Sequence, residues 1–363
     1  MIFARSPYIV TIDELAQEST RLELFLWNGT GAAPAAPTYS LSKKIPSSNQ
    51  TETFYNIAPF IREFFDFSQS NPVVTGSDDL TNDYAYCNVE WKTYYTLGGV
   101  ESLIDTFTDK GFDGFGYYED GYNFTGQQIL LTDLSNYGGA NVYYYPCDID
   151  PEGFTIVTGA AGTNNYWQVV YTNLETGSTQ SFNIGVDVVV NVIKVWASWI
   201  SQGNKVEILD SDEAIVGTYY FVPQCECKYD VVTIDFINRW GGWQREFFFK
   251  ASTENVEMEN NKYKLNPLSF PAYALNEGQY KNFNTNGKRI IKANTGWVNE
   301  NYKQVIEELL LSETIRVNYL GGRADYPAIL RTKSIEKFKN INTKTINYQM
   351  EFELAYDVIN SIS

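Results

Sequence analysis

The feature that most constrains the fold of this chain is an alternation of apolar and polar residues with a period of two. It is clearest near the C-terminus, where every second residue is apolar: Ile346, Tyr348, Met350, Phe352, Leu354 and Tyr356. Successive side chains of a strand point to opposite faces, so the pattern predicts an antiparallel strand with one buried face.

Shorter runs of β-branched and aromatic residues recur along the chain, separated by Gly, Asn, Asp and Pro. They lie at 22–27, 86–95, 142–145, 166–171, 188–196, 219–222, 231–237 and 246–249. Because no helix alternates with them, they favour sandwiches or small barrels over a parallel sheet. We therefore predict a mainly β protein with two or three antiparallel β-sandwich or barrel-like domains, a few short helices and an α+β C-terminal domain.

Two segments have the spacing of helices. The first is NIAPFIREFF at 56–65, with Asn56 as a candidate N-cap, and the second runs from about 299 to 311 with one apolar stripe. Both are interpreted as packing elements.

The distribution of charge indicates a boundary near residue 225. Residues 1–225 hold 9 basic and 27 acidic residues, whereas residues 226–363 hold 18 basic and 17 acidic residues. Together with the turn signals, this predicts an acidic N-terminal β domain at 1–150, a small β domain at 151–225 and a C-terminal β domain with one helix at 226–363. A Gly- and Tyr-rich excursion at about 97–125 is interpreted as a projecting loop of the first domain.

The chain contains no histidine but 27 Tyr, 22 Phe and 8 Trp residues. Histidine is the commonest general base at neutral pH and the usual partner of a nucleophilic Ser or Cys. We therefore expect no enzyme, no catalytic residue and no cofactor. Cys87, Cys147, Cys225 and Cys227 lack the spacing of a zinc site and are expected to be reduced thiols.

Acidic turns are weak candidates for a calcium site or for the carboxylates of a glycosidase. Asp148, Asp150 and Glu152 imitate the start of a calcium loop, but Pro151 and Gly159 break the pattern, so no metal is predicted. Three carboxylate pairs could each be half of a glycosidase site, although solvated turns are the favoured interpretation: Asp78 with Asp79, Glu119 with Asp120, and Asp210 with Asp212. The stretch TGAAGTNN at 158–165 lacks the Lys of a phosphate-binding loop.

Candidate interaction residues come from aromatic and basic clusters. Gly241 and Gly242 predict a hairpin turn with Trp240 and Trp243 as a cross-strand aromatic pair, for which sugar stacking is the less favoured alternative. The other candidates are exposed tyrosines and the densest cationic stretch of the chain: Tyr117, Tyr118, Tyr122, Lys281, Lys288, Arg289 and Lys292. For the cations, an acidic protein neighbour, including the N-terminal part of an adjacent copy, is favoured over nucleic acid.

Several stretches of the chain are distinctive: RSPYIV, LELFLWNGT with PTYSLSK, NIAPFIREFF, IDFINRWGGWQREFFFKASTE, KANTGWVNENYKQVIEELLLSE and INYQMEFELAYDVIN. They resemble the structural tail proteins of tailed phages of Bacteroidetes, the crAss-like phages and their relatives. The similarity covers both ends of the chain, and no stretch between about 97 and 225 matches. The resemblance implies a tail component of the ring, hub or adaptor type and carries no catalytic residue.

The expected function is therefore that of a virion structural protein, which forms a ring, collar or hub of identical copies and contacts other phage tail proteins. Such a protein would be made in the host cytoplasm and reside in the virion tail. It would bind neither membrane nor specific nucleic acid, although acidic residues could line a DNA channel. A glycan-binding or receptor-binding adhesin is the alternative, and a carboxylate-based polysaccharide hydrolase is a weaker one.

Overall fold

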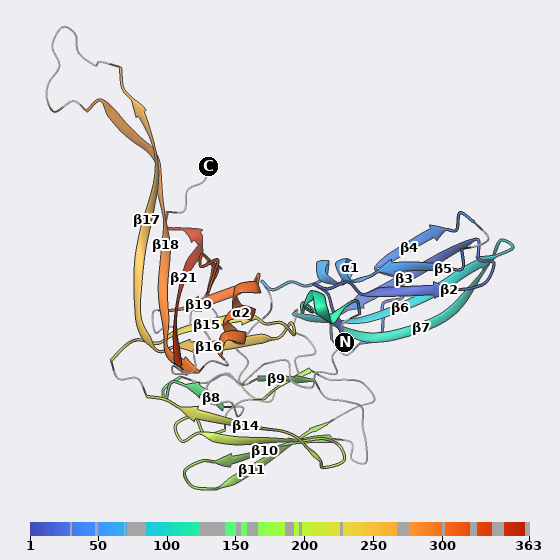
Figure 1. The fold of residues 1–363 in the computed structure, drawn as a ribbon, viewed down its shortest axis with the longest axis horizontal. Helices are drawn as coiled ribbons and strands as arrows, with labels where there is room; N and C mark the ends of the chain where they lie inside the picture. Colours follow the sequence, from blue (N-terminus) through green and yellow to red (C-terminus); the bar gives the residue numbers. More distant parts are fainter. Residues whose placement is uncertain are drawn as a thin grey trace. The chain divides into compact units, whose positions relative to one another are not determined.

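A computed structural model describes the chain as a mainly β protein (Figure 1). Strands make up 58% of the described residues and helices 7%, which confirms the predicted fold class. The described residues are 1–29, 31–47, 50–68, 70, 85–123, 142–149, 154–157, 166–185, 192–195, 198–225, 228–266, 276, 278–299, 302–319, 325–335 and 345–359. Among them, no helix is long and apolar enough to cross a membrane.

The chain divides into two compact units. The first contains Met1–Cys225 together with Asp235–Arg245 and Asn301–Ser312. The second contains Glu226–Ile234, Glu246–Glu300 and Glu313–Ser363. The predicted separation of 1–150 from 151–225 stays a prediction.

A five-stranded sheet and a two-stranded ribbon form the N-terminal part of the first unit. The sheet order is β1 (Ile2–Phe3), β7 (Val100–Phe112), β6 (Tyr86–Leu97), β3 (Ser19–Trp27) and β4 (Tyr39–Lys44). The ribbon pairs β2 (Ile9–Asp13) with β5 (Glu52–Asn56). Alternate residues of β3 and β6, such as Leu24 and Val89, share one core with Ile12 and Tyr55 of the ribbon. This is the sandwich-like packing expected from strands with one apolar face.

The first predicted helix is α1 (Ala58–Glu63), whose Ile61 lies in the same core. Its N-cap is Ile57, not Asn56 as predicted, because Asn56 is the last residue of β5. The Asn56 side chain still accepts the Ala58 N–H at 3.3 Å.

The predicted projecting loop at about 97–125 is wrong for its first part. Residues 100–112 form β7, which pairs with β6 from Val100–Leu97 to Phe112–Tyr86. Gly98 and Gly99 have φ of 60° and 75°, the left-handed conformation that a two-residue hairpin turn requires. Both Gly N–H groups donate to the Glu18 carboxylate at 3.2 Å.

A second sheet of five strands occupies the middle of the chain. Its order is β11 (Thr179–Gly185), β10 (Tyr166–Asn173), β13 (Asn204–Leu209), β14 (Ile215–Pro223) and β8 (Val142–Tyr145). A separate ribbon pairs β9 (Phe154–Val157) with β12 (Val192–Val195). Every second residue of β10 is buried, including Trp167 and Tyr171.

Cys147 and Cys225 form a disulfide, which corrects the expectation of four reduced thiols. β8 and β14 run parallel with Tyr145 opposite Pro223, so the two cysteines, each two residues further on, reach the same level. Their Cα atoms lie 5.2 Å apart, within the usual range for a disulfide. Cys87 is a buried thiol, as the packing interpretation requires.

The C-terminal part of the chain contributes a sheet of seven strands. Its order is β16 (Trp243–Phe248), β15 (Val232–Ile237), β19 (Ile315–Asn318), β20 (Tyr326–Leu330), β21 (Thr345–Asp357), β18 (Tyr280–Asn299) and β17 (Lys250–Lys264). β21 confirms the alternation in the sequence, since Tyr348, Met350, Phe352 and Leu354 are buried. The second predicted helix is α2 (Lys303–Leu311), which starts later than residue 299 because β18 extends to that residue.

The turn between β15 and β16 is a hairpin turn, as predicted. Gly241 has φ of 78°, and the buried Asn238 side chain accepts the N–H groups of Trp240 and Gly242 at 3.0 and 3.1 Å. A Cβ at Gly241 would lie 2.8 Å from the backbone nitrogens of Asp113 and Gly114, so glycine is required for two reasons.

We expect Cys87 to resist alkylation in the folded protein and to react only after unfolding. Burial raises the pKa of its thiol to about 12, and the thiolate is the reactive form. Non-reducing peptide mapping after iodoacetamide treatment should find Cys147 linked to Cys225 and Cys87 unmodified. Rapid labelling of Cys87 in native buffer would contradict this packing.

We expect Gly241→Ala to lower the free energy of unfolding by at least about 1–2 kcal/mol, because it combines a positive φ with backbone clashes. Gly31→Ala is the matched control, since a Cβ there meets nothing within 4 Å. Urea unfolding of both variants measures the difference. Equal midpoints for the two variants would be inconsistent with the tight turn.

Candidate interaction surfaces

The most unusual surface belongs to β17, the edge strand of the seven-stranded sheet. Its residues from Ala251 to Lys264 are all exposed, so neither face of the strand is covered. β21 pairs with β18 only as far as Lys288, whereas β17 stays paired with β18 out to Lys264 opposite Tyr280. Figure 1 shows this two-stranded ribbon continuing past the end of β21. We call residues 258–264 and 280–287 the arm.

Four cations were predicted to form a basic surface. Three of them lie at the base of the arm and are neutralised by carboxylates of neighbouring strands. Lys288 lies 2.8 Å from Glu353, Lys292 lies 2.6 Å from Glu351, and Arg289 lies 3.5 Å from Glu254. The carboxylates come from β21 and β17, which flank β18 in the sheet. These cations therefore cross-link strands.

Lys281, the fourth predicted cation, has a different environment because it lies on the arm. Together with Lys262 and Lys264 it forms no ion pair with any residue in the part of the chain that the structure describes. Exposed aromatic side chains lie beside the lysines: Tyr263 packs against Phe283 at 5.5 Å, and Tyr280 is 64% exposed. The arm thus presents cations and aromatic rings to solvent.

The predicted aromatic candidates separate into packed and exposed residues. Trp240 packs edge-on against Phe3 at 5.7 Å, and Trp243 donates its indole N–H to Ser70 at 2.7 Å. Both of these partners lie in the N-terminal part of the first unit. Packing is the interpretation that the geometry favours for both.

Arg239 organises the segment around Tyr117. Its guanidinium lies 2.6 Å from the Asp120 carboxylate, 4.5 Å from the centre of the Tyr117 ring and 4.9 Å from that of Trp240. Burial and the carboxylates of α2 raise the pKa of Tyr117. Tyr117 is thus held in place, whereas Tyr118 in the short 3-10 helix Tyr118–Asp120 is fully exposed and Tyr122 is 76% exposed.

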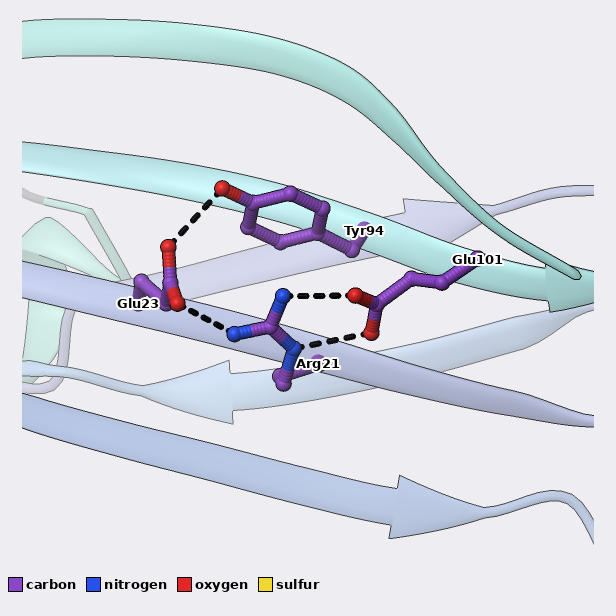
Figure 2. A network of polar contacts seen from close by, with 4 residues as sticks. All are labelled: Arg21, Glu23, Tyr94 and Glu101. Atoms are coloured by element: carbon purple, nitrogen blue, oxygen red, sulfur yellow. Dashed lines mark hydrogen bonds and ion pairs between the residues drawn. The ribbon is translucent and has the colours of Figure 1, made fainter.

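A polar network crosses the open face of the N-terminal sheet (Figure 2). Arg21 of β3 donates two hydrogen bonds to the carboxylate of Glu101 in β7, at 2.8 and 2.6 Å, and also pairs with Glu23. The Arg21 guanidinium lies 4.2 Å from the centre of the Tyr94 ring, and the Tyr94 hydroxyl donates to Glu23 at 2.8 Å. The network ties β3, β6 and β7 together.

The electrostatics of this network suit a cross-link. Hydrogen bonds from Arg21 lower the pKa of Glu101. In turn, the hydrogen bonds to the carboxylates of Glu101 and Glu23 raise the pKa of Arg21. A general acid in sugar hydrolysis needs a carboxyl group with a raised pKa. Glu101 is therefore ionised at neutral pH and poorly suited to that role.

One member of each described carboxylate pair has a structural partner. Asp120 binds Arg239, and Asp210 accepts the N–H groups of Asp212 and Ala214 at 2.9 Å, as in an acidic turn. Asp78, Asp79, Asp150, Glu152 and the stretch 158–165 lie outside the described residues. No cluster of three metal-binding side chains occurs in the described ranges.

Sequence reasoning missed Lys262, Lys264 and Tyr280 because the polar stretch around them shows no apolar alternation. It also missed Trp297, which is 71% exposed at a bulge of β18. The clustering of Tyr and Lys at 262–264 and 280–281 could have indicated an exposed interaction surface.

We expect Arg21 and Glu101 to be coupled by about 0.5–1 kcal/mol in a double-mutant cycle of Arg21→Lys and Glu101→Gln, because the pair is bidentate but partly exposed. The folded-state pKa of Glu101 is lowered, so this stabilisation should be present above its ordinary value of 4.5 and be lost as pH falls further. Urea unfolding at pH 7 and pH 3 measures it, with Asp105→Asn as control. Coupling that is unchanged at pH 3 would contradict the assignment.

We compared the chain with protein-family models and with curated proteins. No protein-family model matches the chain, and no curated protein matches it at a significant level. A function for the chain must therefore be argued from the surfaces described above.

Proposed function

We propose that the chain is a structural protein of a bacteriophage tail, which assembles into a ring or collar through contacts between protein subunits. The resemblance of both chain ends to tail proteins of crAss-like phages suggests the setting. The observation that carries the proposal is the arm, because an uncovered two-stranded ribbon needs a neighbour.

The arm has little support of its own and a long exposed edge. A lone two-stranded hairpin is at best marginally stable in water, and a long exposed edge strand is a template for pairing with another chain. Fourteen consecutive residues of β17 are exposed, including the apolar Val256 and Met258. A protein whose working state is an assembly covers such a ribbon with a neighbouring subunit.

The charge distribution supports the same proposal. The N-terminal 225 residues carry 18 more acidic than basic residues, whereas the remainder is almost neutral and exposes arm lysines that form no ion pair with any described residue. Separate acidic and basic surfaces favour head-to-tail contacts between identical copies, and such contacts close into rings when the rotation fits. Acidic residues facing a central channel would also repel passing DNA.

We expect purified particles of the encoding phage to contain this protein in multiple copies in the tail. Quantitative mass spectrometry of the particles gives its copy number relative to the capsid protein, and a cryo-EM map places it along the tail axis. A scaffolding protein that leaves before maturation serves as a negative control. Absence of the chain from infectious particles would overturn the proposal.

An adhesin that binds host glycans is the second candidate, and the exposure of Tyr118 and Tyr122 favours it. Exposed aromatic rings stack on sugar rings. The expected outcome is glycan-array binding that Tyr118→Ala with Tyr122→Ala abolishes, while Tyr117→Phe retains it. A broad array without any bound glycan would remove this candidate.

A further inference from the structure

We infer that the arm of one copy docks on the end of the β2–β5 ribbon of a second copy. This inference rests on the proposed function and names the two surfaces that meet. It follows from the charged and aromatic side chains that each surface exposes by itself.

One face of the arm carries a compact set of groups. Lys262 and Lys264 are two residues apart on β17 and so point to the same face, and Tyr280 of β18 lies directly opposite Lys264. All three are exposed, and neither lysine has an ion-pair partner among the described residues. Two like charges beside an aromatic ring leave this face without a neutralising partner.

The outer face of the β2–β5 ribbon shows the complementary chemistry. Asp13 lies directly opposite Glu52, and Phe54 follows Glu52 on the same face and is 60% exposed. Like charges directly opposite each other across a strand pair destabilise it. Neither carboxylate has an ion-pair partner in the described ranges, so a cation from outside would relieve their repulsion.

Two neighbours complete this end of the ribbon. Leu15, in the turn after β2, is 80% exposed and adds apolar area. The Lys43 ammonium lies 4.6 Å from the centre of the Phe54 ring, so this ring already accepts one cation. Two ammonium groups and a tyrosine ring on the arm therefore match two carboxylates and a phenylalanine ring on the ribbon.

The occupant of the ribbon face is a second copy because the two surfaces are different patches of the same chain. A contact between different patches is heterologous, and repetition of it produces a ring or a filament. It would cover the part of the arm beyond Asn286, where the described residues of β17 and β18 pair only with each other.

The test uses full-length chains with reversed charges. The arm variant is Lys262→Glu with Lys264→Glu, and the ribbon variant is Asp13→Lys with Glu52→Lys. Each should raise the dissociation constant for self-association at least about a hundredfold, as measured by analytical ultracentrifugation. Lys228→Glu with Lys333→Glu changes the net charge equally at other exposed lysines and should leave association unchanged.

Mixing the two variants distinguishes contact between copies from contact within a chain. The intact arm of the ribbon variant should bind the intact ribbon of the arm variant, and the two substituted patches should also bind each other because their charges are exchanged. The mixture should therefore regain the association that each variant alone has lost. A chain carrying all four substitutions should regain association, since the charges are exchanged, and this also verifies that the variants fold.

Three outcomes would overturn the inference. They are unchanged association of the arm variant, no regained association in the mixture, and a wild-type chain that stays monomeric up to about 100 μM. None of them removes the chain from the virion, so the proposed function is judged separately by the composition of purified particles.

Discussion

The whole architecture depends on the need of each extended segment for a neighbouring strand that takes up its backbone N–H and C=O groups. In the sheets this need is met over long sequence separations, as in the pairing of β1 with β7 and of β8 with β14. Because the backbone supplies these hydrogen bonds, strands with few apolar residues are also held in place. β17 is the extreme case, since pairing with β18 is its main support.

That dependence explains how far the sequence could be interpreted. Strands with one buried face, such as β3, β10 and β21, reveal themselves by alternation, and their existence was predicted. β7 and β17 expose most of their residues on both faces, so neither shows an apolar period and neither was predicted. The disulfide could not be predicted from the sequence either, because Cys147 and Cys225 are 78 residues apart and are brought together only by the register of β8 and β14.

The candidate residues illustrate a related limit. A dense run of basic residues at 281–292 predicted an outward-facing cationic surface, but its members at 288, 289 and 292 have carboxylate partners on adjacent strands. Sequence density of charge says nothing about such cross-strand pairing, because the partners lie far along the chain. Lys262, Lys264 and Lys281, which lack ion pairs among the described residues, lie farther out, where the ribbon has only two strands.

The composition of the first unit has a consequence for biosynthesis. Its segments include Asp235–Arg245 and Asn301–Ser312, and Arg239 and Leu311 bind Asp120 and Arg5 respectively. The unit that begins at residue 1 therefore cannot be completed until the ribosome has translated residue 312. A fragment ending at residue 225 would lack the arginine that holds Tyr117, and the first unit is complete only after residues 246–300 of the second unit have been made.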